Sequence, residues 1–90
     1  MDETEQTRTP AEEDARIEAT VLRWLLALHP IQITFEELLR DVCEEPDDFA
    51  ERDGLERAIR ELAGSGLVHR NGTLVIPTRA ALRFYQLEDR

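Results

Sequence analysis

The sequence predicts a mostly helical α+β domain that contains one small β hairpin. Apolar residues recur at helical spacing through most of the chain, glycines punctuate residues 64–66, and two short β-favouring runs flank Asn71-Gly72. Ninety residues, of which 41% are hydrophobic, suffice for one domain with one modest core. We therefore expect a single domain over residues 11–90, preceded by a disordered acidic tail over residues 1–10.

The first helix is predicted to run from Thr9-Pro10 to about Leu28. Thr9 is placed as the N-cap, with the proline in the first turn and Glu12 at the third helical position, which is the arrangement of a capping box. His29-Pro30 ends the helix, because a residue that precedes proline is pushed out of the helical region.

Apolar residues cover more than one face of this first helix. Four of them follow the spacing of a single buried stripe, and three others widen the apolar surface. The stripe consists of Ile17, Val21, Leu25 and Leu28, and the additional residues are Leu22, Trp24 and Leu26. Two interpretations follow: a central helix that is packed on several sides, or a dimer interface that includes Trp24.

A short strand and a second helix are predicted next. Ile31-Gln32-Ile33 alternates and favours β structure, as a small edge strand would. Thr34 and Glu37 then form a second capping box, which starts a helix that continues to about Glu44. The buried residues of this helix are expected to be Phe35, Leu38, Leu39 and Val42.

The sequence allows two starting points for a third helix. The two candidate capping boxes are Asp48 with Glu51, and Asp53 with Glu56. We favour a short turn over residues 47–51 and a helix from about Arg52, because Gly54 is costly in a helix interior. The face of this helix that points away from the core is expected to carry Asp53, Arg57, Arg60, Glu61 and Gly64.

A β hairpin and a last helix complete the domain. Glycines at residues 64–66 stop the third helix, and the strand-like runs 67–70 and 73–76 are separated by Asn71-Gly72. This dipeptide favours the positive φ angles of a type I′ turn and is therefore a strong hairpin signal. Thr78 is expected to cap the last helix, whose apolar residues are Ala81, Leu82, Phe84, Tyr85 and Leu87.

Residues 58–70, AIRELAGSGLVHR, resemble the end of the recognition helix and the start of the wing in bacterial winged-helix regulators. Members of that family typically carry a Leu-x-x-x-Gly-Leu-Val-x-Arg pattern at this point. The resemblance extends over roughly residues 14–88, and it implies a winged helix-turn-helix: a three-helix core, a two- or three-stranded wing and a C-terminal helix. Abundant arginine without any lysine also suggests a GC-rich genome.

The resemblance implies a small transcription regulator that binds double-stranded DNA. Its helix near residues 52–64 would lie in the major groove, and its hairpin would lie against the phosphate backbone. The implied DNA-binding residues are Arg57, Arg60, Arg70, Asn71, Arg52, Thr73 and Arg79. A homodimer is expected because one module of this size has a limited footprint. Its candidate interface residues are Trp24, Leu22, Leu26, Phe84 and Tyr85.

The charge of the chain favours an alternative function. The formal net charge is −9, with −11 in residues 1–53 and +2 in residues 54–90. Because an acidic protein repels nucleic acid at long range, any nucleic-acid interface must lie in the C-terminal half. The alternative is a winged-helix module that binds another protein through its acidic surface and does not bind DNA. Arg57 and Arg60 would then form ordinary i,i+4 pairs with Glu61 and Glu56.

Several other classes of function are not expected. Cys43 is the only cysteine, so the chain can form neither an internal disulfide nor a cysteine metal cluster. His29 and His69 lack a nucleophile or acid at diagnostic spacing, and no glycine loop could hold a phosphate. We therefore expect no enzyme activity, cofactor or metal. No run approaches the roughly 18 apolar residues that cross a bilayer, and the N-terminus is acidic, so we expect a cytoplasmic protein without a membrane partner.

Overall fold

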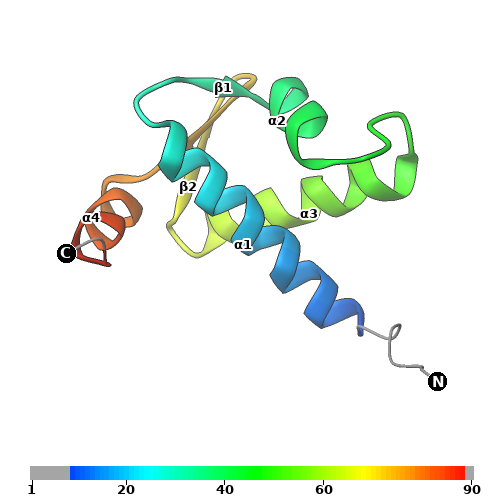
Figure 1. Ribbon diagram of the computed structural model, residues 1–90, viewed down its shortest axis with the longest axis horizontal. Helices are drawn as coiled ribbons and strands as arrows, with labels where there is room; N and C mark the ends of the chain where they lie inside the picture. The colour runs from blue at the N-terminus through cyan, green and yellow to red at the C-terminus, as the bar shows by residue number, and fades with distance from the viewer. Residues whose placement is uncertain (1–8, 89–90) are drawn as a thin grey trace.

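The computed structural model describes residues 9–88, which form four helices and a three-stranded antiparallel sheet (Figure 1). This arrangement confirms the predicted α+β class. The elements in order are α1 (Pro10–Leu28), β1 (Ile33–Thr34), α2 (Phe35–Val42), α3 (Phe49–Gly64), β2 (Val68–Asn71), β3 (Leu74–Pro77) and α4 (Arg79–Glu88). No helix among the described residues is long and apolar enough to cross a membrane.

The N-terminal cap of α1 is the predicted capping box. The Thr9 hydroxyl accepts a hydrogen bond from the Glu12 backbone N–H (3.1 Å), and the Glu12 carboxylate accepts one from the Thr9 N–H (3.0 Å). Pro10 is the first residue of the helix, as the predicted cap places it, although the predicted domain boundary assigned it to the tail. The rest of the predicted tail lies in residues 1–8, outside the described residues. The helix ends at Leu28, before His29-Pro30, as expected.

A three-stranded sheet joins the start of α2 to the hairpin. The strand order is β1-β3-β2, with Val75 of β3 opposite Ile33 of β1 and also opposite Arg70 of β2. The predicted strand at residues 31–33 is therefore present, but it is shifted to Ile33–Thr34. Ile31 is outside the strand and 63% exposed. The strand is shifted because it forms only where the chain pairs with β3. The chain comes beside β3 only after the turn that follows α1.

The turn of the hairpin differs from the predicted type I′ turn. Asn71 pairs with Leu74, so the two loop residues are Gly72 and Thr73 rather than Asn71 and Gly72. Gly72 has a φ of 63°, whereas neither Asn71 nor Thr73 has a positive φ. These signs are those of a type II′ turn, in which glycine takes the first central position. This turn needs only one residue with a positive φ, which glycine adopts more readily than asparagine.

The predicted start of α3 at Arg52 is wrong. The helix begins at Phe49, and the Asp48 side chain caps it by accepting a hydrogen bond from the Ala50 N–H (3.0 Å). Gly54 therefore lies inside the helix, where it is buried against α1. A Cβ at this position would lie 3.5 Å from Cδ1 of Ile17. Packing of α3 against α1 thus outweighs the low helix propensity of one glycine.

The core lies between α1, α2, α3 and the sheet. Its largest fully buried side chains are Leu25, Leu38, Leu39, Leu55, Ile59, Val21 and Val75. The helix α4 lies apart, at the left of Figure 1, and Ala81 is its only buried residue among those described. Thr78 joins it to the core, since its hydroxyl accepts from the Ala81 N–H (3.2 Å) and donates to the Gly66 carbonyl (2.8 Å). This confirms the predicted cap of the last helix.

Candidate nucleic-acid interface

The helix α3 has one face in the core and one face in solvent. Leu55, Ile59 and Leu62 are buried, whereas the residues that the sequence assigned to the outer face are all exposed. These exposed residues are Asp53, Arg57, Arg60, Glu61 and Gly64. The face therefore carries two arginines and two carboxylates, so its charge is balanced rather than strongly positive.

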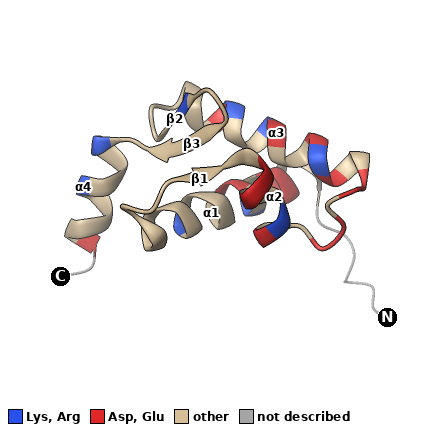
Figure 2. Cartoon of the chain, turned by 90° about the horizontal axis from the view of Figure 1, so that it is seen from above, with Lys and Arg blue, Asp and Glu red and all other residues tan. Residues whose placement is uncertain are grey.

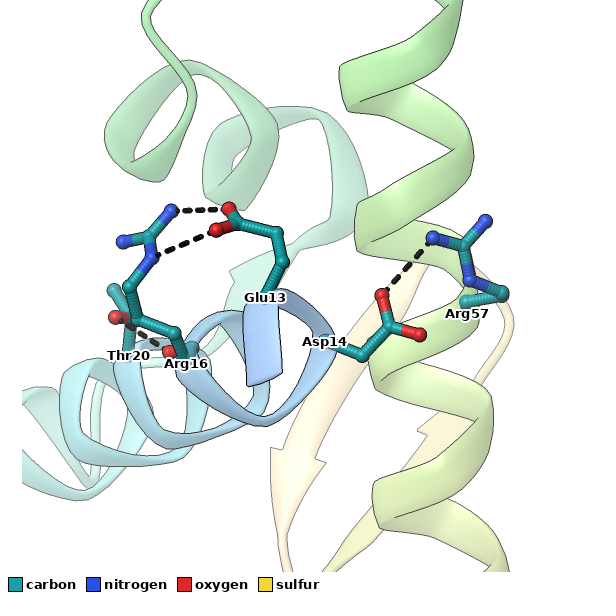
Figure 3. Close-up of polar contacts among 5 residues, drawn as sticks. All are labelled: Glu13, Asp14, Arg16, Thr20 and Arg57. Atoms are coloured by element: carbon teal, nitrogen blue, oxygen red, sulfur yellow. Dashed lines mark hydrogen bonds and ion pairs between the residues drawn. The ribbon is translucent and has the colours of Figure 1, made fainter. Parts of the chain in front are cut away.

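Arg57 is held by a carboxylate of the first helix. Its Nη2 lies 3.0 Å from Oδ1 of Asp14 on α1 (Figure 3). The hydrogen bond to Asp14, the charge of Asp14 and the charge of Asp53 all raise the pKa of Arg57 above its ordinary value. The alternative interpretation paired Arg57 with Glu61, four residues further along the helix, but its observed partner is Asp14. Because α1 crosses beside α3, a carboxylate far away in sequence is closer than the one on the next turn.

Two further candidate arginines meet at the start of α2. The Cζ atom of Arg52, from α3, lies 5.4 Å from the ring centroid of Phe35, and the Cζ atom of Arg70, from β2, lies 5.6 Å from the same centroid. Both distances are within the range of a cation–π interaction. Arg52 also forms an ion pair with Glu36, which follows Phe35 in α2. We call these four residues the Phe35 junction.

The register of the sheet explains how Arg70 reaches the Phe35 junction. Residues opposite one another on neighbouring strands share a face, so Arg70 lies on the same face as the buried Val75. That face is turned toward the helices. In addition, the Phe35 N–H donates to the Thr73 carbonyl (2.8 Å), which attaches the turn of the hairpin to the first residue of α2.

The structure thus brings some of the predicted DNA-binding residues together but not all of them. Arg52 and Arg70 meet at the Phe35 junction, and Asn71 and Thr73 lie at the adjacent end of the hairpin. Arg57 and Arg60 lie on the outer face of α3. Arg79 is the first residue of α4, and α4 lies at the opposite end of the molecule from the start of α3 (Figure 1).

Acidic residues gather on one side of the described chain, over α2 and the connection to α3 (Figure 2). They are Glu36, Glu37, Asp41, Glu44, Glu45, Asp47 and Asp48. The hairpin and α4 instead carry Arg70, Arg79 and Arg83, with Glu88 as the one carboxylate of the described part of this region. The sequence predicted this division into an acidic and a weakly basic half.

Most of the predicted dimer-interface residues line one groove between α1 and α4. Leu22 and Leu26 face it from α1, Phe84 and Tyr85 face it from α4, and its volume is about 410 Å³. Trp24 lies elsewhere, because its Nε1 donates to Oδ2 of Asp41 on α2 (3.2 Å). Sequence reasoning missed three other lining residues, which are Ala19, Arg23 and Glu88. The i, i+3, i+4, i+7 spacing of Ala19, Leu22, Arg23 and Leu26 was the available signal.

A second cavity, of about 300 Å³, lies beside Cys43. The half-buried thiol has a pKa raised above its ordinary value, chiefly by burial and also by its proximity and hydrogen bond to Glu51. A thiol that is harder to deprotonate is a poorer nucleophile. Within residues 9–88, no three histidine, cysteine, aspartate or glutamate side chains are placed to hold a metal ion.

Comparison with known proteins adds nothing to this geometry. No protein-family model, curated protein or solved structure matches the chain. Any statement about function must therefore be drawn from the residues and their arrangement.

Proposed function

We propose that this chain is a winged-helix domain that binds duplex DNA, with α3 as the reading helix and the β2–β3 hairpin as the wing. Its order of elements and its sheet, in which β3 lies between β1 and β2, support the proposal. They match what the resemblance of residues 58–70 implies: three helices followed by a hairpin that extends directly from the third.

The observation that carries the proposal is the Phe35 junction. There, one guanidinium group from α3 and one from the hairpin lie over the same aromatic ring. In the proposed complex, the DNA backbone beside the reading helix would pass the wing at this point. The planar guanidinium group can donate paired hydrogen bonds to a phosphate, so Arg52 and Arg70 are suited to position the duplex.

Arg60 is the residue best placed to read base edges. It is exposed on the outer face of α3, and within residues 9–88 it forms no ion pair. Arginine recognises guanine through paired hydrogen bonds in the major groove. Asn71 and Thr73 would add backbone contacts from the wing, and Arg57 would contribute after leaving Asp14. Arg79 stays outside this surface because it belongs to α4.

A second function is favoured by the carboxylates that hold two of these arginines. Glu36 pairs with Arg52 and Asp14 pairs with Arg57, so two of the candidate cations are already neutralised. Together with the acidic side formed by α2, this arrangement suits a winged-helix module that binds a basic protein surface and leaves DNA unbound. Such a protein complex would weaken with added salt because opposite charges attract across it.

Selection from a random duplex library at low salt distinguishes the two functions. The native chain is compared with an Arg60→Ala/Arg70→Ala variant and with Arg83→Ala, which removes an exposed arginine from α4. Enrichment of a motif by the native chain and by Arg83→Ala, but not by the double variant, is the expected result. If the native chain binds no duplex even at the lowest salt, the DNA proposal is overturned and the acidic surface becomes the interface to investigate.

A further inference from the structure

The helix α4 exposes an unusual amount of apolar surface for its length. It has ten residues, of which Ala81 alone is buried, while Phe84 is 62% exposed, Leu87 51% and Tyr85 38%. An isolated helix shorter than about 12 residues is marginal in water, so α4 depends on contacts with other elements for its stability. Within the described residues, those contacts bury Ala81 and leave substantial parts of Phe84, Leu87 and Tyr85 exposed.

A second apolar stripe on α1 faces α4. Successive residues of a helix are separated by about 100°, so Leu22 and Leu26, which are four positions apart, lie on the same side of α1. Val21 and Leu25 are buried in the core. Leu22, which is partly buried against that core, and Leu26, which is 8% exposed, also line the groove. The sequence interpretation of α1 as a helix with more than one apolar face therefore holds, and the second face is the α1 wall of the groove.

Among the described residues that line it, the groove carries one cation and one anion, on opposite walls. Arg23 lies on α1 and Glu88 lies on α4, and both side chains line the groove and are exposed. Within the described residues, neither forms an ion pair. A surface with one charge of each sign on either side of an apolar centre is complementary to itself when it is turned by a two-fold rotation.

We propose that a second copy of this chain covers the α1–α4 groove and forms a two-fold symmetric dimer. In such an interface, residue i contacts residue j of the other copy and residue j contacts residue i, so Arg23 of each copy faces Glu88 of the other. Phe84 enters the apolar centre between Leu22 and Leu26 of the opposite copy. The proposal goes beyond DNA binding and does not depend on it, because the groove is formed by α1 and α4 and not by α3.

The apolar part of the interface is tested with two phenylalanine variants. Sedimentation equilibrium of the native chain is expected to give a dimer, and Phe84→Ser is expected to shift it to monomer. Phe49→Ser is the matched control, since Phe49 is 80% exposed but lies at the start of α3. A native chain that remains monomeric, or equal losses of dimer in both variants, would overturn the proposal.

The charged part is tested by exchanging the two signs. Arg23→Glu and Glu88→Arg each place like charges opposite one another at both ends of the interface, and each is expected to weaken dimerisation by about tenfold or more. When the two variants are mixed, both contacts join opposite charges again, and a heterodimer is expected. Because a pair within one chain is not restored by mixing, failure of the mixture to dimerise would contradict the proposed contact across the interface.

Discussion

Gly54 lies in the interior of α3, where glycine costs about 1 kcal/mol relative to alanine. A Cβ atom at this position would meet Cδ1 of Ile17 at 3.5 Å, which is an ordinary van der Waals contact. Gly54→Ala is therefore expected to stabilise the fold by up to about 1 kcal/mol, because alanine reduces the freedom of the unfolded chain without a clash. Urea-induced unfolding of both proteins measures the difference.

Gly66 is the control for this substitution and should respond in the opposite direction. It follows α3 with a φ of 80°, a conformation that a side chain disfavours even though the space around it is open. Gly66→Ala is thus expected to lower the free energy of unfolding. If both substitutions change the free energy of unfolding in the same direction, the difference in backbone conformation between Gly54 and Gly66 does not determine their effects.

Asp14 is expected to limit the contribution of Arg57 to DNA binding. Asp14→Asn removes the ion pair between α1 and α3 and leaves Arg57 available to a phosphate. Under the proposed function, DNA affinity should rise, and the slope of log affinity against log salt should steepen by about 0.9 for the added phosphate contact. Fluorescence anisotropy at several salt concentrations measures both quantities.

Glu13→Gln is the matched control for Asp14→Asn. It removes the same charge from the adjacent position of α1, where Glu13 pairs with Arg16 of the same helix (2.6 Å; Figure 3). Both variants reduce the net negative charge by one, and only Asp14→Asn releases an arginine of α3. Equal increases in affinity would show that net charge, and not the release of Arg57, is responsible.

At the scale of elements, α2 depends strongly on its N-terminal cap. The helix has eight residues, which is too short to be stable alone, and its Thr34 hydroxyl accepts from the Glu37 N–H (3.1 Å). Thr34→Ala is expected to destabilise the domain by about 1 kcal/mol, whereas Thr34→Ser should retain most of that stability because serine is an equally good cap. Thermal unfolding followed by circular dichroism gives the comparison.

The same capping box predicts a pH dependence. Hydrogen bonds from the Thr34 backbone and hydroxyl to the Glu37 carboxylate hold the pKa of Glu37 below its ordinary value. A carboxylate with a lowered pKa in the folded state stabilises the fold above its unfolded pKa, and this contribution is lost as pH falls through the folded pKa. Glu37→Gln should therefore flatten the acid side of the stability profile. Glu56→Gln, which removes a carboxylate outside any capping box, should leave that side unchanged.

At the scale of the whole molecule, the two proposals together predict the symmetry of the DNA site. If α3 reads DNA and a second copy covers the α1–α4 groove, the selected motif should be two-fold symmetric, with half-sites about 34 Å apart, or one turn of the duplex. Phe84→Ser should select a single half-site with lower affinity. If a native dimer selects an asymmetric motif, DNA reading by α3 and dimerisation through the α1–α4 groove cannot both be correct.

The division of charge also belongs to the whole molecule. Carboxylates concentrate over α2 and its connection to α3, while the hairpin and α4 carry arginines (Figure 2). This pattern is visible in the sequence as −11 in residues 1–53 and +2 in residues 54–90. The pairing of individual charges is not visible there, because Asp14 with Arg57 and Glu36 with Arg52 are distant in the chain.

Signals that act over a few residues were sufficient to predict most of the elements. The capping boxes at Thr9 and Thr34 and the end of α1 before Pro30 are present in the structure, and so is the hairpin predicted at Asn71-Gly72, although its loop residues are Gly72 and Thr73. Each depends on a hydrogen bond or a steric restriction between neighbours in the chain, which is why the sequence alone reveals it. Apolar spacing likewise identified the two faces of α1.

Only tertiary packing decided that Gly54 lies inside α3, where the short β1 strand pairs and which charges meet. Gly54 is accepted inside α3 because the helix packs against Ile17 of α1, and β3 sets the position of the short β1 strand. Arg52 and Arg70 converge on Phe35 only when α2, α3 and β2 are assembled. Such contacts join residues far apart in sequence, so their energies depend on the geometry of the whole fold and leave no local pattern to read.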